Sequence, residues 1–289
     1  MTLEQVYRAG KKELEKAGLD SPAFDAMCLF RQAFGMDRQA LIMEGAAPAE
    51  EAKAAAFEEA VRQRAEGRPL QYILGCWPFL DMELRVGEGV LTPREETELL
   101  VRTAAGLLRR RQPACGRGEG LSLLDLCAGT GAVALGLAGE FPAAQVQAAE
   151  WYPQAYEYLQ ENIRLTGRAV EPLRLDVLDP ASPEAFSGLA LLTANPPYVA
   201  SGEIPSLQRE VQREPRTALD GGGDGLLFYR AIAARWLACL APGGVCAVEI
   251  GEGQGEAVAA LFRSAGLEQT EIFQDFNCLD RVVAGIKGK

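Results

Sequence analysis

Residues 121–150 read LSLLDLCAGTGAVALGLAGEFPAAQVQAAE, which predicts a strand, a glycine-bearing turn, a helix and a second strand. Further apolar strands are predicted at residues 172–177, 189–194 and 244–250, and helices at about 153–166 and 225–240. Strands that alternate with helices of this length indicate parallel βαβ units in a doubly wound sheet. Residues 271–276 and 281–286 predict a closing antiparallel pair. The expected fold class is α/β.

The chain before this region has a different pattern, with helices in place of alternating strands and helices. Residues 1–66 predict helices, with a capping-box pattern at Thr2 and Gln5, a start signal at Ser21-Pro22, and a third helix from Pro48 to about residue 64. Glycine, proline and aromatic residues then interrupt short β-prone runs, and a helix is expected from Glu95 to about residue 110. We therefore expect a helical domain over residues 1–67, a β-hairpin linker over 68–94 and a catalytic domain over 95–289.

Composition excludes several mechanisms. The 289 residues include no histidine, so a Ser-His-Asp triad, an HExxH metal site and an imidazole base are all ruled out. The 40 acidic and 29 basic residues give a net charge of -11, which weighs against a partner held mainly through phosphates. No apolar run reaches the roughly 18 residues of a membrane span, and no signal-peptide core is evident. The expected location is the cytoplasm.

The cysteines are odd in number and contain no CxxC pair, which favours reduced thiols over disulfides or a zinc cluster. No metal site is expected. They are Cys28, Cys76, Cys115, Cys127, Cys239, Cys246 and Cys278.

The turn after the first strand of the sheet, residues 125–131, carries a GxG pattern. Such a turn lets backbone amides at a helix N-terminus approach a ligand. Glu150 ends the next strand about 20 residues downstream, where a carboxylate can accept hydrogen bonds from ribose hydroxyls. A nucleoside cofactor is therefore expected. Because Gly129, Gly131 and Ala134 fit only the looser GxGxxA form, the turn does not distinguish a dinucleotide from S-adenosylmethionine.

The tetrapeptide Asn195-Pro196-Pro197-Tyr198 directly follows a predicted strand. Two prolines remove two backbone donors, so the loop offers mainly acceptors, namely the Asn195 side-chain oxygen and the Pro196 carbonyl. Acceptors hold a planar NH2 group, and Tyr198 can lie against its flat face. This pattern favours a methyl donor over a hydride carrier, and the alternative is an ordinary β-turn with proline at its favoured positions.

With these motifs the chain resembles the HemK/PrmC family of protein-(glutamine-N5) methyltransferases over nearly its whole length. Members use S-adenosylmethionine, which becomes S-adenosylhomocysteine, to methylate the glutamine of the GGQ motif in peptide chain release factors. The motifs that carry the resemblance are NPPY, RPLQYILG from Arg68, LTPREETE from Leu91, DLCAGTGAVAL from Asp125, EVQREPRTALDGGGDGLLFYR from Glu210, APGGVCAVEIGEGQG from Ala241 and DRVVAG from Asp280. The implied fold is a Rossmann-like class I methyltransferase sheet with an N-terminal helical bundle that recognises the substrate protein.

The resemblance also implies site roles. The glycine-bearing turn would wrap the methionine part of the cofactor, Glu150 would hold its ribose, and Asp176 with Val177 would border the adenine. The implied catalytic residues are Asn195, Pro196, Pro197 and Tyr198, and the implied cofactor-binding residues are Cys127, Ala128, Gly129, Thr130, Gly131, Glu150, Asp176, Val177 and Asn195. Cys127 stands where many members have glycine, a difference that should be tolerated if the φ of Cys127 is negative.

An amide nitrogen is a poor nucleophile, so hydrogen bonds from its NH2 to two acceptors are expected to replace a general base. The expected partners are release factors, with no nucleic acid or membrane, and the chain is expected to be a monomer. Three alternatives remain at this point: a methyltransferase acting on an exocyclic NH2 of a nucleic acid, a non-catalytic binding module with a vestigial site, and a hydride-transferring dinucleotide enzyme.

Overall fold

The computed structural model describes residues 1–114 and 116–288, and its chain divides into two compact units. The first comprises Met1–Cys76 together with Gln208–Arg213, and the second comprises Trp77–Leu207 and the chain from Glu214 onward. Cys115 lies outside the described residues, and the six cysteines within them are unpaired by disulfides. The inclusion of residues 208–213 in the first unit is signalled by no feature of the sequence.

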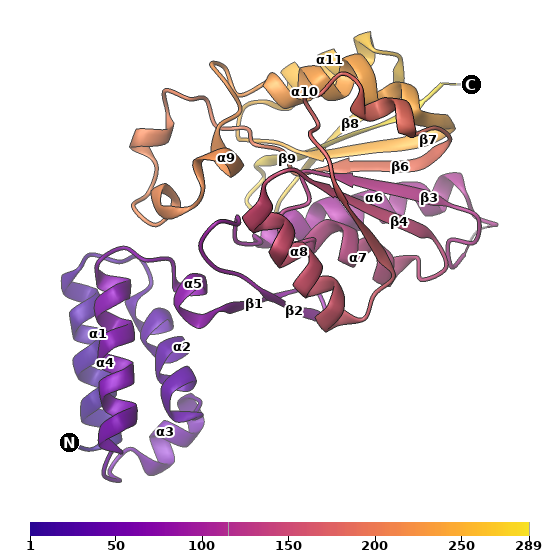
Figure 1. The fold of residues 1–289 in the computed structure, drawn as a ribbon. Coiled ribbons are helices and arrows are strands. Elements are labelled where there is room, and N and C mark those ends of the chain that lie inside the picture. The colour runs from indigo at the N-terminus through magenta and orange to yellow at the C-terminus, as the bar shows by residue number, and fades with distance from the viewer. Residues whose placement is uncertain (115, 289) are drawn as a thin grey trace. The chain divides into compact units, whose positions relative to one another are not determined.

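The first unit is helical, as expected (Figure 1). The capping box at Thr2 and Gln5 forms. The third helix begins three residues later than predicted because residues 47–49 lie extended beside residues 1–3, with Ala49 N donating to Met1 O at 3.0 Å. A short helix capped by Asp37 was not predicted, although an N-cap aspartate is a start signal. The helices are α1 (Leu3–Lys16), α2 (Pro22–Phe34), α3 (Arg38–Glu44), α4 (Glu51–Ala65) and α5 (Leu70–Leu74).

The interior of this unit combines aromatic packing with a buried ion pair. Phe30 contacts Phe57 edge to face with ring centroids 5.5 Å apart. The buried Arg64 pairs through Nε with Asp25 at 2.7 Å and through Nη2 with Glu210 at 3.3 Å. Glu210 is thus the residue through which the later segment contributes charge to this interior.

A two-stranded hairpin follows, with β1 at Cys76–Phe79 and β2 at Met82–Arg85. The hairpin was expected, whereas the helix α5 just before it was not. The next helix, α6 (Glu95–Arg111), begins where the sequence placed it.

The second unit contains a seven-stranded sheet in the order β5-β4-β3-β6-β7-β9-β8. β9 runs antiparallel to both of its neighbours, β7 and β8, and the other pairs are parallel, which confirms the expected closing pair and the α/β fold class. Several predicted bounds differ, since β5 begins before residue 172 and ends before 177, β7 begins before 244, and β8 begins before 271. The strands are β3 (Ser122–Leu126), β4 (Gln145–Glu150), β5 (Val170–Arg174), β6 (Leu189–Ala194), β7 (Leu240–Glu249), β8 (Leu267–Gln274) and β9 (Asp280–Lys287).

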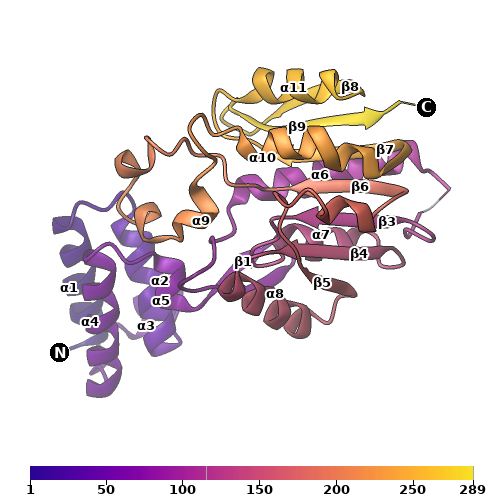
Figure 2. The ribbon, with the colours of Figure 1, turned by 45° about the horizontal axis from the view of Figure 1, so that its top comes forward.

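Helices cover both faces of this sheet (Figure 2). α6, α7 (Ala132–Glu140) and α8 (Pro153–Thr166) pack on one face, and α10 (Leu227–Ala231) and α11 (Gly255–Ser264) on the other. The single helix expected over 225–240 is α10 followed by a π-helix, Ile232–Trp236, and a 3-10 turn, Leu237–Cys239. The remaining short helices are Ser182–Ala185, Ile204–Ser206, Val211–Arg213 and α9 (Arg216–Leu219). None of the helices in the described ranges is long and apolar enough to cross a membrane.

Candidate functional site

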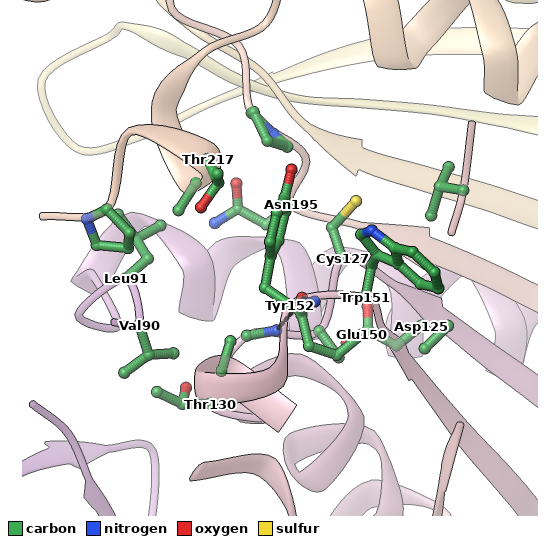
Figure 3. A pocket seen from close by; sticks show the side chains of 18 of the residues that line it. Val90, Leu91, Asp125, Cys127, Thr130, Glu150, Trp151, Tyr152, Asn195 and Thr217 are labelled. Atoms are coloured by element: carbon green, nitrogen blue, oxygen red, sulfur yellow. Dashed lines mark hydrogen bonds between the residues drawn. The ribbon is translucent and has the colours of Figure 1, made fainter. Parts of the chain in front are cut away.

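The sheet order reverses direction between β3 and β6, and the second unit has a cavity at this edge. In open parallel sheets, ligands bind outside the carboxyl ends of the strands at such a switch point. Cys127 follows β3, Glu150 ends β4 and Asn195 follows β6, so three predicted residues meet there. In Figure 3, Val90 and Leu91 lie on one side of the cavity and Cys127 and Trp151 on the other.

Most of the predicted site residues line this cavity. They are Cys127, Ala128, Gly129, Thr130, Glu150, Asp176, Val177, Asn195 and Pro197, whereas Gly131, Pro196 and Tyr198 are not among the lining residues. The sequence did not single out Val90, Leu91, Thr92, Pro93, Thr97, Asp125, Trp151, Tyr152, Leu175, Leu178, Pro215, Thr217, Ala218 and Phe228, which also line it.

The turn after β3 corrects one expectation. Cys127 has a φ of +55°, so the condition of a negative φ is not met, and Gly129 and Gly131 have φ of +54° and +85°. The turn is tight, with Ala128 N donating to Ala149 O at 3.0 Å and Gly131 N donating to Ala128 O at 2.7 Å. A left-handed conformation costs an L-residue roughly 1–2 kcal/mol. The cysteine therefore occupies a position whose backbone suits glycine.

Glu150 is held in place by the backbone. Its Oε2 accepts from Gly129 N at 2.8 Å and its Oε1 from Tyr152 N at 2.9 Å. Burial raises the pKa of this carboxyl, and backbone donors oppose the rise. Each ionised carboxylate oxygen can accept a further hydrogen bond, so Glu150 can receive two more donors, such as the two hydroxyls of a ribose.

The segment after β5 forms an apolar part of the wall. Val177 is buried and its carbonyl accepts from Trp236 Nε1 at 3.1 Å. Asp176 Oδ1 accepts from Leu178 N at 2.8 Å. Together with Leu175 and Phe228, these residues give a surface suited to a flat base.

Asn195 presents an unused acceptor. Its Nδ2 donates to Thr97 Oγ1 at 3.3 Å, while its buried Oδ1 has no hydrogen-bond partner. Buried polar atoms are rarely left unpaired, so an orphaned acceptor on a cavity wall indicates a ligand donor. Tyr198 is held instead beside the cavity wall, where Gln254 Nε2 donates to its carbonyl at 2.9 Å.

Known proteins match the chain along its length. Residues 5–75 match the family description PrmC N-terminal domain, and residues 105–231 match Methyltransferase small domain. A release factor glutamine methyltransferase of Moorella thermoacetica is 37% identical over 97% of this chain and 97% of its own. One from Geobacter sulfurreducens is 36% identical over 98% of this chain and 96% of its own. The chain belongs to the release factor glutamine methyltransferase family.

Membership confirms the predicted family and makes the chain a methyltransferase with the Rossmann-like sheet of class I S-adenosylmethionine enzymes. A solved structure, titled the hMettl16 catalytic domain in complex with MAT2A 3'UTR hairpin 6, is 12% identical over 82% of each chain, with a TM-score of 0.52. That likeness concerns the fold alone.

In this family member, a glycine-rich loop supports the NPPY backbone. A Cβ at Gly221 would lie 2.8 Å from Pro197 O, and one at Gly225 would lie 2.4 Å from Tyr198 O. Gly221 N also donates to Val199 O at 2.8 Å. Here the motif DGGGDG, which the sequence offered only as a resemblance, acts by letting two backbones approach closely.

Three acidic residues near the cavity were not singled out from sequence. Asp125 Oδ1 accepts from Thr193 Oγ1 at 2.7 Å, its Oδ2 is unpaired, and burial raises its pKa to about 7. Glu214 accepts from Thr92 N at 3.3 Å and from Arg94 Nη2 at 2.6 Å, thereby joining two distant motifs. Glu249 is the third. The sequence feature that could have identified these three residues is an acidic residue within or next to an apolar segment, because burying a carboxylate without a partner costs free energy.

Proposed function

We propose that this protein transfers a methyl group from S-adenosylmethionine to the side-chain amide nitrogen of the GGQ glutamine in peptide chain release factors. The observation that supports this most is the buried, unpaired Oδ1 of Asn195 on the cavity wall. It suits a substrate NH2, which needs acceptors. Relatives named release factor glutamine methyltransferases supply the substrate class.

The residues present fit S-adenosylmethionine. Asp125 Oδ2 is a second orphaned acceptor on the wall and suits a cationic ligand. Glu150 would hold the ribose, the turn from Cys127 to Gly131 the methionine part, and Asp176 and Val177 the adenine. When bound, the cofactor supplies an electrophilic methyl group on a sulfonium.

The chain itself contributes position and hydrogen bonding. Asn195 and the Pro196 carbonyl would each accept from the substrate NH2, fixing it and keeping electron density on nitrogen. Tyr198 and Pro197 would hold the backbone of the NPPY loop in this conformation. The absence of histidine agrees with this scheme, because no general base is required before transfer.

Asn195→Ala tests the assigned role. We expect methyl transfer to fall by roughly a hundredfold, the scale of losing one preorganised polar group, while cofactor affinity changes little. Single-turnover rates and calorimetric binding give the two quantities. Asn277→Ala, an exposed asparagine in the β8–β9 turn, is the matched control. Undiminished transfer in Asn195→Ala would reject the role.

The reaction is tested by mass spectrometry of a release factor after incubation with enzyme and cofactor. One added methyl on the GGQ glutamine is expected. Parallel incubations with DNA and RNA test the runner-up, and methylation there without methylation of the release factor would overturn the proposal.

We also propose that residues 1–67 recognise the folded release factor, that 68–94 link this domain to the catalytic domain of 95–289, and that the protein acts in the cytoplasm. One glutamine in a glycine-rich loop offers too little area for selection. A separate docking surface therefore accounts for specificity.

A further inference from the structure

Glu249 is a buried acid to which the proposed function gives no role. It ends β7 and is 3% exposed. Ala194 pairs with Val248 in the parallel register of β6 and β7, so the next residues, Asn195 and Glu249, lie side by side at the carboxyl edge of the sheet. Glu249 is not among the residues that line the cavity.

Thr97, near the start of α6, completes a cluster with these two side chains. Asn195 Nδ2 donates to Thr97 Oγ1 at 3.3 Å. Burial raises the pKa of Glu249 to about 7, and hydrogen bonding by the Thr97 and Asn195 side chains opposes the rise. Glu249 Oε2 is buried and has no hydrogen-bond partner, so the carboxyl group has an acceptor free for a hydroxyl beside it.

The donors and acceptors fix a direction along this cluster. A carboxylate only accepts. Thr97 Oγ1 accepts from the Asn195 NH2, so the one hydrogen of its hydroxyl remains available for the Glu249 carboxylate. The Asn195 amide is then turned with nitrogen toward Thr97 and Glu249. Its oxygen is then on the side away from this cluster, where it is buried and has no hydrogen-bond partner.

We propose that Glu249 is a positioning residue that, together with Thr97, orients the Asn195 carboxamide so that its oxygen faces the substrate amide. This inference rests on the proposed function. A protonated Glu249 can donate a hydrogen bond, which permits the flipped amide. That amide would present NH2 to the substrate NH2, two donors facing each other.

Other charged groups around Glu249 set the pH range. Glu96 raises its pKa and Arg281 lowers it. Arg281 Nε also pairs with Asp275 at 2.9 Å. The hydroxyls of Tyr198 and Tyr229 also interact electrostatically with Glu249. Burial raises the pKa of both hydroxyls, so they stay neutral near pH 7. Glu249 is thus the member of this group that titrates there.

The first experiment compares Glu249→Gln with the native enzyme at saturating cofactor and release factor, from about pH 5.5 to about pH 8.5. In the native enzyme we expect kcat to fall by at least about fivefold as the pH is lowered through about 7, where Glu249 becomes protonated. In Glu249→Gln we expect a kcat at least about fivefold lower at pH 8, because a carboxamide can donate as well as accept and so does not fix the orientation of Asn195. We also expect no acid limb, that is, no fall of kcat at low pH, because a carboxamide does not titrate. Glu256→Gln, which changes an exposed glutamate of α11, is the control and should retain both the rate and its fall at low pH.

A second pair of variants tests the relay through Thr97. Thr97→Ser keeps the hydroxyl and should keep most of the rate. Thr97→Val keeps the shape without the hydroxyl and should lower kcat with little change in cofactor affinity. An acid limb that survives in Glu249→Gln, or equal rates in the Ser and Val variants, overturns the proposal.

A third measurement does not depend on methyl transfer. The chain has three asparagines, Asn162, Asn195 and Asn277, so their side-chain NH2 signals can be assigned by asparagine labelling and substitution. The Asn195 NH2 signal of the free enzyme should shift with a midpoint near pH 7, and should not do so in Glu249→Gln. Failure of the native enzyme to methylate a release factor would reject the proposed function, and a pH-independent Asn195 signal would reject the role of Glu249.

Discussion

At the scale of single residues, the site combines positions that sequence patterns identify with positions that they do not. Glu150 was predictable because a carboxylate about 20 residues after a glycine-bearing turn can accept hydrogen bonds from a ribose. It ends β4 as expected. Glu249 was not, because its role depends on the register between β6 and β7, which brings it beside Asn195. A single sequence contains no direct record of that pairing.

The φ of Cys127 is a second feature of the site that sequence patterns do not reveal. The residue type is read directly from the sequence, but the left-handed φ of this turn is a property of the folded backbone. Because a Cβ at φ of +55° is strained, Cys127→Gly should be more stable than Cys127→Ala by about 1 kcal/mol. This reverses the order seen in helices, and both variants lose the same thiol. Urea unfolding gives the difference, and a more stable alanine variant would contradict the expectation.

At the scale of elements, α8 and β6 have the bounds that their apolar patterns predicted, because burial on a sheet or helix face sets those patterns. The helix expected over 225–240 breaks into three types, which apolar spacing alone does not reveal. Close backbone approach is also hidden from pattern analysis. The loop carrying Gly221 and Gly225 is the example nearest the site.

Gly225→Ala tests this support. Gly225 has a φ of +73°, and a new Cβ would lie 2.4 Å from Tyr198 O, which also accepts from Gln254. We expect displacement of the NPPY loop and a loss of methyl transfer of roughly 10- to 100-fold, with the fold retained.

Gly223→Ala is the control, since nothing lies within 4 Å of its Cβ position. Transfer rates and far-ultraviolet circular dichroism are the measurements. Equal rates in the two variants would show that the loop's close approach does not matter for catalysis.

At the scale of the whole molecule, the proposed division of labour can be tested on the surface of α3. Ile42 and Met43 are 77% and 78% exposed, unusual for large apolar side chains and typical of docking surfaces. The double variant Ile42→Asp, Met43→Asp should raise KM for the whole release factor about tenfold and leave transfer to a short GGQ peptide unchanged. Leu165→Asp, an exposed apolar residue of α8, is the control. Equal losses on both substrates would count against recognition by residues 1–67.

The return of residues 208–213 to the first unit has a consequence for biosynthesis. The helices that contain Asp25 and Arg64 leave the ribosome well before Glu210 is translated. Until then Arg64 lacks one of its two carboxylate partners. The amino-terminal helices therefore complete their interior only after most of the chain has been made, so a ribosome stalled before residue 210 would carry them in an unfinished and protease-sensitive state.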